Sequence, residues 1–312
     1  MRTLAAMAPQ TVSRRGSRVT GDPRVTVVIP CHNSLRRLPE TLETVLGQSF
    51  GDFEVVLVDD GGDDDLAGWA SSLHDDRVRV VRQENAGVAA ARNHGIAQAR
   101  AELVAFLDSD DLWLPHTLAS LVERYDEAVA DPCAAGEPPV GLVYGWYQIA
   151  DEEGHPVGRV EARDAEGVVW EQFVVSNPVA TGATLVPTVI LEQLGGFEVN
   201  RDRFPVDVED WELWIRIAGA GYRVALVRDV LCLYRRHSSN SSVAVDSLDS
   251  AYRHLLAKVF DGQPPRRRWL LAPAVARVEM ILAWQSLNDP RRSAAGEGLP
   301  AFRPTSSSGR CA

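Results

Sequence analysis

Apolar residues in the first part of the chain occur in short, almost continuous runs separated by longer stretches of mixed character. The runs are rich in Val, Ile, Leu and Phe, and they predict buried strands at 25–29, 53–58, 78–81 and 103–107. Between them, helical spacing, alanine content or a proline in the first turn predict helices at 35–46, 87–100 and 115–129. Strands that are apolar throughout are typical of a parallel sheet covered by helices on both faces.

The pattern changes after residue 130. A Pro/Gly/Ala-rich segment precedes a predicted hairpin that turns at Glu153-Gly154, with strands at 140–149 and 157–161. Further elements are predicted as a helix at 169–175, a strand at 183–186, a helix ending at Gly195-Gly196, a helix at 211–218, one or two strands in 222–234, and two helices from 245 onward. We therefore expect one α/β domain with a mixed, Rossmann-like sheet flanked by helices, and a C-terminal helical extension.

These changes suggest boundaries along the chain. We expect a disordered N-terminal tail at 1–23, a single domain at 24–243, C-terminal helices at 244–290 and a disordered tail at 291–312. Within the domain, 24–130 and 131–243 form two halves.

Charge and cysteine content narrow the class of protein. The net charge is −11 at pH 7, which argues against a nucleic-acid partner because such proteins usually present a basic face. The four cysteines are scattered, without a C-x-x-C pair, and predict reduced thiols in a cytoplasmic protein. No stretch approaches the roughly 20 apolar residues of a membrane-spanning helix, and 1–24 lacks the apolar core of a signal peptide.

Polar residues follow three of the predicted strands, at Pro30-Cys31-His32-Asn33, Asp59-Asp60-Gly61-Gly62 and Asp108-Ser109-Asp110-Asp111. Because parallel strands end at one edge of the sheet, these loops are expected to converge there, where α/β proteins bind ligands. Adjacent carboxylates repel each other unless a cation compensates them, which favours a divalent metal. At such an edge Asp60 is able to accept hydrogen bonds from a nucleotide base, and His32 offers a ring for stacking.

Six segments occur in an order that is similar to a known family: 25–33 (VTVVIPCHN), 56–62 (VLVDDGG), 85–95 (NAGVAAARNHG), 107–113 (LDSDDLW), 208–214 (VEDWELW) and 234–242 (YRRHSSNSS). Together they closely resemble family 2 glycosyltransferases, which have the GT-A fold. The resemblance covers about residues 24–242, with 24–130 as the nucleotide-sugar half and 131–243 as the acceptor half. One departure is Gly62, where the family commonly has serine.

The resemblance implies roles on the donor side. Asp60 matches a carboxylate that pairs with the base, His32 an aromatic position that packs on it, and Arg92 an arginine near the nucleotide. Pro30 and Asn33 belong to the same nucleotide-sugar-binding segment as His32. Asn85 is expected to cap the helix that carries Arg92.

Asp108 and Asp110 match the D-x-D pair of the family. Asp110 is expected to bind Mg²⁺ or Mn²⁺ bridging the diphosphate, and Asp108 to lie near the ribose or the donor sugar while also reaching the metal. His237 is expected either as a further metal ligand or as polar surface. Arg235 and its neighbour Arg236 are expected either to oppose the phosphates or to face solvent.

The acceptor half supplies the expected reaction. Asp210 matches the family's general base, which removes the proton of the attacking hydroxyl. Glu209 and Trp211 beside it are expected to contact the acceptor. Without the other motifs, Glu209-Asp210 would read as an acidic helix start favoured by the helix dipole.

The sequence therefore predicts an inverting, metal-dependent glycosyltransferase that moves a hexose from a nucleoside diphosphate sugar, with a UDP-sugar favoured, to a hydroxyl acceptor. The acceptor is expected to be a glycan, lipid-linked or small molecule, as in polysaccharide biosynthesis. Two alternatives stay open: a nucleotidyltransferase of similar fold and a catalytically silent nucleotide- or sugar-binding subunit. The segment 266–284 is basic and then apolar, so it is expected to pack on the protein, to close a homodimer, or to rest on the cytoplasmic face of a membrane.

Overall fold

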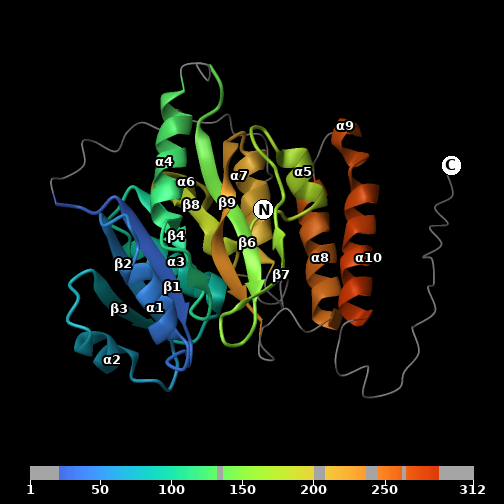
Figure 1. Ribbon diagram of the computed structural model, residues 1–312. Coiled ribbons are helices and arrows are strands. Elements are labelled where there is room, and N and C mark those ends of the chain that lie inside the picture. The colour runs from blue at the N-terminus through green and yellow to red at the C-terminus, as the bar shows by residue number, and fades with distance from the viewer. Residues whose placement is uncertain (1–20, 132–135, 200–207, 237–244, 262–264, 288–312) are drawn as a thin grey trace, which may run out of the picture.

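The computed structural model describes residues 21–131, 136–199, 208–236, 245–261 and 265–287. Its described strands form one mixed sheet in the order β3-β2-β1-β4-β8-β6-β9-β5, with β7 paired to β6 (Figure 1). The helices cover both faces of this sheet, and the predicted tails at 1–23 and 291–312 lie, apart from 21–23, outside the described residues.

The first half is a parallel sheet, as the continuous apolar runs predicted. Its strands are β1 (Val25–Cys31), β2 (Phe53–Asp60), β3 (Val78–Gln83) and β4 (Leu103–Phe106). β1 lies between β2 and β4, and β3 pairs with the outer side of β2. The apolar character of β1, β2 and β4 follows from full burial between two helical layers.

Successive residues of each strand face opposite layers, which divides the core in two. One layer contains α1 (Leu38–Leu46), α2 (Leu66–Ser72) and α4 (Thr117–Ala130). α3 (Val88–Gln98) covers the other face. The sequence did not predict α2, a short helix whose cap, the carboxylate of Asp65, accepts a hydrogen bond from the Gly68 N–H at 3.0 Å.

The second half continues the sheet with mixed direction. β8 (Thr184–Pro187) is antiparallel to β4, and β6 (Val140–Ala150) is antiparallel to β8. β7 (Pro156–Glu161) completes the predicted hairpin, and β9 (Arg223–Arg235) is one irregular strand parallel to β6. The two-residue β5 (Leu112–Trp113), which the sequence did not predict, pairs with β9. The helical elements of this half are α5 (Trp170–Val175), η2 (Thr181–Ala183), α6 (Thr188–Leu194) and α7 (Glu209–Gly219).

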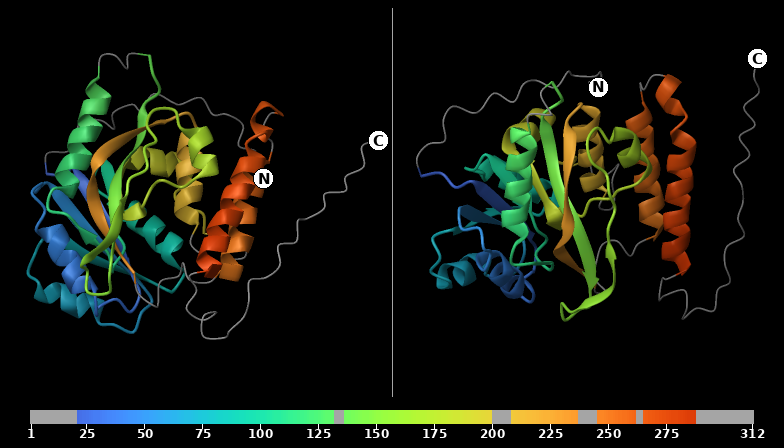
Figure 2. Two further views of the ribbon diagram at one scale, coloured as in Figure 1. Left: turned by 45° about the vertical axis from the view of Figure 1, so that its right-hand side comes forward. Right: turned by 45° about the horizontal axis from the view of Figure 1, so that its top comes forward.

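The C-terminal helices stand beside the second half (Figure 2). They are α8 (Val245–Phe260), the single turn α9 (Pro265–Arg268) and α10 (Leu271–Leu287). α10 packs on α8 and α5, and Arg267 lies over the Trp170 ring at 4.2 Å from its centroid. In the part of the chain that the structure describes, no helix combines the length and the apolar character needed to cross a membrane.

Candidate active site

The carboxylate of Asp60 at the end of β2 holds the start of α3. It accepts hydrogen bonds from the backbone N–H groups of Ala86 and Gly87 and from the Gln83 side chain, each at 2.8 Å. Asn85 is therefore not the cap that the sequence predicted. Gly87 occupies the cap position with φ +90°, and Asp60 supplies the acceptor that satisfies the first N–H groups.

His32 and Asn33, at the end of β1, lie next to this junction and are exposed. The His32 Nδ1 lies 3.0 Å from the carbonyl oxygen of Asp60 and 3.2 Å from the Asn85 amide nitrogen. The Asn33 side chain accepts a hydrogen bond from the Asp63 N–H at 2.7 Å. Pro30 is buried within β1, where it pairs with β2. The structure thus brings the predicted nucleotide-binding residues of β1 and β2 to one edge.

The acidic loop after β4 is fixed by Arg235 at the end of β9. The Arg235 guanidinium donates to the carbonyls of Asp110 and Glu152, at 2.7 and 2.8 Å, and to the Glu40 carboxylate at 2.7 Å. Its backbone N–H donates to the Asp111 carboxylate at 2.9 Å. Arg235 is only 2% exposed, so it neither faces solvent nor stands free to oppose phosphates, and its observed role is to clamp the loop.

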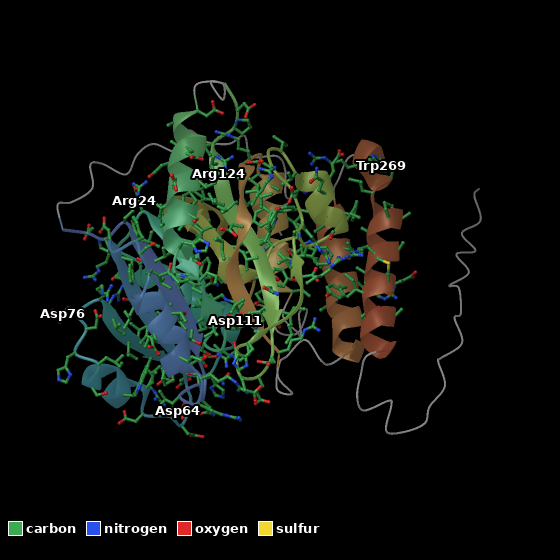
Figure 3. The ribbon with its side chains drawn as sticks, viewed as in Figure 1. Arg24, Asp64, Asp76, Asp111, Arg124 and Trp269 are labelled. Carbon is green, nitrogen blue, oxygen red and sulfur yellow. The ribbon has the colours of Figure 1, made fainter. Side chains whose placement is uncertain are left out.

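Asp111 lies in the middle of the molecule, where the two halves meet (Figure 3). Burial raises the pKa of its carboxyl well above the ordinary value, and the charges of Asp108 and Asp110 raise it further. The hydrogen bond from the Arg235 N–H acts in the opposite direction. Proximity of the three carboxylates in this loop thus favours the neutral form of Asp111.

Arg92 connects this loop to the second half. Its guanidinium donates to Asp108 at 2.6 Å and to Glu209, the first residue of α7, at 2.5 Å. Burial by itself would lower the pKa of Arg92. The negative charges of Asp108 and Glu209 outweigh burial, so the pKa is raised. The Nε of Arg92 is buried without a hydrogen-bond partner, so the side chain is held by its two end nitrogens.

Asp210 stands beside this ion-pair chain at the start of α7. Its carboxylate accepts hydrogen bonds from the Thr181 hydroxyl at 3.1 Å and from the Trp211 N–H at 2.5 Å. Burial raises its pKa above the ordinary value, Asp108 adds to the rise, and Arg92 and the two donors reduce it. Asp210 is therefore within electrostatic reach of both Arg92 and Asp108, which the sequence alone could not establish.

Glu209 and Trp211, the predicted acceptor residues, both point into the protein. Glu209 is 5% exposed and pairs with Arg92, and Trp211 is 3% exposed. The indole N–H of Trp211 donates to the Phe173 carbonyl at 2.5 Å. A direct acceptor contact by these two side chains stays a prediction that their burial does not favour.

The donor set at the acidic loop fits a divalent cation that is shared with a phosphate ligand. Asp108 and Asp110 offer hard oxygen ligands, and Mg²⁺ commonly takes one or two carboxylates together with substrate phosphates. No group of three or more His, Cys, Asp or Glu side chains forms a complete metal site within the described ranges. His237 lies outside those ranges.

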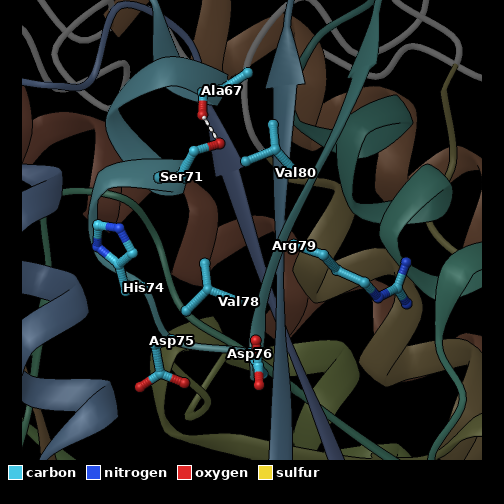
Figure 4. Close-up of a pocket in the computed structure, with 9 residues that line it drawn as sticks. Ala67, Ser71, His74, Asp75, Asp76, Val78, Arg79 and Val80 are labelled. Carbon is cyan, nitrogen blue, oxygen red and sulfur yellow. Dashed lines mark hydrogen bonds between the residues drawn. The ribbon is translucent and has the colours of Figure 1, made fainter.

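A separate surface hollow of about 450 Å³ lies between α2 and β3, at the far edge of the sheet (Figure 4). Two of its charged lining residues are already paired, Arg79 with Glu54 and Asp75 with Arg77. The chemistry-bearing residues at the strand ends are not among those that line it, so we do not assign the site to this hollow.

Comparison with known proteins identifies the class. The sequence profile of "Glycosyl transferase family 2" matches residues 26–160. Glycosyltransferase GlyG of Streptococcus pneumoniae serotype 4 is 37% identical over 249 residues, which are 76% of this chain and 78% of that protein. The chain therefore belongs to glycosyl transferase family 2 and is a glycosyltransferase. This assignment replaces the two alternatives, a nucleotidyltransferase and a silent binding subunit.

Other relatives are longer or more distant. An uncharacterized glycosyltransferase of Rickettsia felis is 32% identical over 206 residues, but the chain spans only 31% of its length. The Escherichia coli protein WfaP, named a UDP-Glc:alpha-D-GlcNAc-diphosphoundecaprenol beta-1,3-glucosyltransferase, is 25% identical over 70% of this chain and 79% of that protein.

Solved structures confirm the predicted GT-A fold class. S. aureus TarS 1–349 in complex with UDP-GlcNAc superposes with a TM-score of 0.63 at 18% identity, covering 81% of this chain and 72% of that one. The mannosyltransferase PcManGT from Pyrobaculum calidifontis, in complex with GDP-Man and Mn²⁺, gives a TM-score of 0.57 at 24% identity, covering 90% and 78%.

Sequence reasoning missed Thr181 and the clamping role of Arg235. Thr181 opens the short turn η2 before β8, where no spacing or composition marks it, and its relevance appears only through its bond to Asp210. Arg235 belongs to a recognisable motif, but its function depends on the loop of Asp110, which lies 125 positions earlier.

Proposed function

We propose that this glycosyltransferase is an inverting, metal-dependent enzyme that transfers a sugar from a nucleoside diphosphate sugar to a hydroxyl acceptor. The observation that carries the proposal is the chain of contacts from Asp108 through Arg92 to Glu209, with Asp210 beside it. These contacts connect the acidic loop of the donor half to the start of α7, where the carboxylate of Asp210 is half-buried.

The donor's nucleotide is proposed to lie at the ends of β1 and β2. His32 and Asn33 are exposed there. His32 is proposed to stack on the base, and Asn33 to make polar contacts with the nucleotide. The carboxylate of Asp60 already receives three hydrogen bonds from the chain, so its expected pairing with the base is the least supported donor contact. A UDP-sugar is favoured because TarS is solved with UDP-GlcNAc and with UDP, although PcManGT holds GDP-Man.

Asp108 and Asp110 are proposed to hold Mn²⁺ or Mg²⁺, with His237 as a further ligand. Such a cation supplies positive charge to the leaving diphosphate as a Lewis acid. Arg235 holds the Asp110 backbone in place, and Arg92 holds the Asp108 carboxylate.

Asp210 is proposed to act as the general base. Its Oδ receives the proton of the acceptor hydroxyl while that oxygen forms the new bond to the anomeric carbon and the bond to the diphosphate breaks on the opposite side. The raised pKa of Asp210 suits this task, because a carboxylate with higher proton affinity accepts a proton more readily. Glu209 is proposed to position Arg92.

The acceptor is proposed to be a hydroxyl of a glycan, consistent with polysaccharide biosynthesis. The enzyme is proposed to act in the cytoplasm or at the cytoplasmic face of a membrane. Support comes from WfaP, whose name describes a sugar acceptor on a lipid diphosphate.

The test is calorimetric titration with UDP and with GDP, in Mn²⁺, in Mg²⁺ and in EDTA, followed by assay of nucleotide release from UDP- and GDP-sugars. We expect binding at least about tenfold tighter with metal, and Asp110→Asn to remove that difference. The exposed Asp76, which lies in the hollow by α2, gives the matched control Asp76→Asn. Metal-independent binding that is equal in Asp110→Asn and wild type would overturn the metal assignment, and absence of nucleotide release from every donor would overturn the reaction.

A further inference from the structure

Trp113 connects the acidic loop to a turn of the second half. It lies in β5, the strand that follows the loop, and is 3% exposed. Its indole N–H donates a hydrogen bond to the Gly182 carbonyl at 2.5 Å, across 69 positions of the chain. Gly182 is the middle residue of η2. The indole therefore fixes how far this turn lies from the acidic loop.

The backbone of Trp113 is held by α1. Its N–H donates to the Thr44 hydroxyl at 3.1 Å. One turn earlier on the same helix, the Thr41 hydroxyl donates to the carbonyl of Ser109 in the acidic loop, also at 3.1 Å. Because one helix holds both Ser109 and Trp113, the indole extends from a backbone whose position relative to the loop is fixed.

The turn η2 carries the hydroxyl that contacts the proposed base. Thr181, the residue before Gly182, donates to the Asp210 carboxylate at 3.1 Å. Its own carbonyl accepts a hydrogen bond from the Thr184 hydroxyl at 2.7 Å, and all residues of η2 are buried. Trp113 and Asp210 are therefore joined through two adjacent residues of η2.

Close packing restricts η2 on the side of the acidic loop. A Cβ atom at Gly182 would lie 2.8 Å from the sulfur of Cys232 and 3.6 Å from the carboxylate of Asp111. The first distance is shorter than such atoms adopt without a bond, so Gly182 already touches β9 and has no room for a side chain. η2 cannot move toward the loop, and the hydrogen bond from Trp113 opposes movement away from it.

We propose that Trp113 is a positioning residue of the transfer reaction, which sets the place of Asp210 relative to the acidic loop by holding η2. The inference rests on the proposed function, in which the loop holds the cation at the leaving diphosphate and Asp210 deprotonates the attacking hydroxyl. Bond formation and bond breaking occur on opposite sides of the anomeric carbon, so the loop and the base must keep one separation. A misplacement of about 1 Å in such an arrangement lowers the rate about a hundredfold.

Trp113→Phe tests this role because it keeps an aromatic ring and removes the N–H donor, which leaves the buried Gly182 carbonyl unpaired. We expect kcat for sugar transfer to fall at least about tenfold, while the Kd for UDP with Mn²⁺ stays within about twofold. Thr184→Val removes the second hydrogen bond that holds Thr181 and is expected to act in the same direction. It carries the same test if Trp113→Phe does not fold.

Combination with Thr181→Val separates positioning from a general structural role. Because Trp113 acts through the Thr181 hydroxyl, the double variant Trp113→Phe/Thr181→Val is expected to be no more than about twofold slower than the slower single variant. Two independent structural defects would instead multiply their effects on kcat.

The pKa of Asp210 gives a readout that needs no sugar substrate. The hydrogen bond from Thr181 lowers this pKa, so Trp113→Phe and Thr184→Val are expected to raise it by about 0.5 or more. Carboxyl ¹³C NMR of aspartate-labelled protein measures the pKa, with Asp210→Asn to assign the signal.

Tyr222→Phe is the matched control, because it also removes a donor from a buried aromatic side chain. Tyr222 is 3% exposed and its hydroxyl donates to Gln193 at 2.8 Å. It precedes β9, at the opposite end of that strand from Arg235. Both kcat and the pKa of Asp210 are expected to match the wild type in this variant.

Three results would each overturn the proposal: a kcat within about twofold of wild type in both Trp113→Phe and Thr184→Val, an unchanged pKa of Asp210 in both, or losses that multiply in the double variant. Full transfer by Asp210→Asn would instead count against the proposed function. The pKa readout would then still decide whether Trp113 positions that carboxylate.

Discussion

Arg92 and Glu209 are 117 positions apart in the chain, and their side chains form a buried ion pair at 2.5 Å, with 4% and 6% of the side chains exposed. The same guanidinium binds Asp108, which is 31% exposed. One arginine thus joins the end of β4 to the beginning of α7. Because an unpaired charge is costly inside a protein, each of these three charged side chains constrains the positions of the other two.

The first prediction concerns that coupling. Arg92→Met leaves Glu209 buried without its cation and is expected to lower the free energy of unfolding by about 3–5 kcal/mol. Glu209→Gln leaves Arg92 with Asp108 and is expected to cost about 1–3 kcal/mol. The double variant Arg92→Met/Glu209→Gln is expected to cost clearly less than the sum of the two single changes. Urea unfolding measures all of these, and strictly additive costs would contradict the coupling.

The second prediction concerns the pH dependence of transfer. Asp210→Asn is expected to reduce transfer at least about a hundredfold, with UDP binding unchanged. A base works only when deprotonated, and burial raises the pKa of Asp210 above 3.8, so the wild-type rate is expected to fall in acid with a midpoint above that value. Thr181→Val removes a hydrogen bond that lowers this pKa and is expected to move the midpoint upward.

The matched control for this pH profile is Thr188→Val. The Thr188 hydroxyl donates to the Ala101 carbonyl at 2.7 Å instead of to Asp210. Its profile is expected to coincide with that of the wild type. A midpoint that stays in place, or moves down, in Thr181→Val would argue against Asp210 as the titrating base.

The third prediction concerns the clamp on the acidic loop. Arg235→Lys loses the several directed hydrogen bonds of the guanidinium, so the Asp110 backbone is held less firmly. We expect the affinity for UDP with Mn²⁺ to fall at least about tenfold, or about 1.4 kcal/mol, in calorimetry. Arg223→Lys is the control at the other end of β9, where the guanidinium contacts Pro138, Ala128 and Glu137. It is expected to leave that affinity unchanged. Equal losses in both variants would mean that the clamp has no specific role.

The fourth prediction concerns stability in acid. Burial would raise the pKa of Glu54, but hydrogen bonds from Arg79, Arg100 and Thr26 outweigh it and lower the pKa from 4.5 to about 2. A lowered pKa stabilises the fold above pH 4.5, and this contribution disappears as the pH falls toward 2. Glu54→Gln is therefore expected to destabilise the protein by on the order of 2 kcal/mol at pH 7.

The difference between Glu54→Gln and wild type is expected to shrink steadily between pH 4.5 and 2.5, as measured by urea unfolding at each pH. The exposed Glu43 gives the control Glu43→Gln, which is expected to stay within about 0.5 kcal/mol of wild type throughout. A penalty that is the same at pH 7 and pH 2.5 would show that the charge of Glu54 is not what stabilises the fold.

Much of the fold could be predicted from the sequence because its signals are local. The strands at 25–31, 53–60 and 103–106 lie where the apolar runs placed them, since burial on both faces requires such runs. The edge that carries His32, Asp60 and Asp108 followed from parallel strand direction alone. The family was evident from the ordered motifs, and the profile match confirms it.

What the tertiary structure decided is which residues meet. Asp60, rather than the neighbouring Asn85, holds the start of α3, because the alternation of β2 points its carboxylate at that helix. Trp211 is in the core because α5 and α8 cover its face of α7. β5 and the roles of Arg235 and Glu209 depend on partners far away in the chain. Local periodicity reports how much of a residue is buried, whereas the identity of its neighbour is fixed only when distant segments pack together.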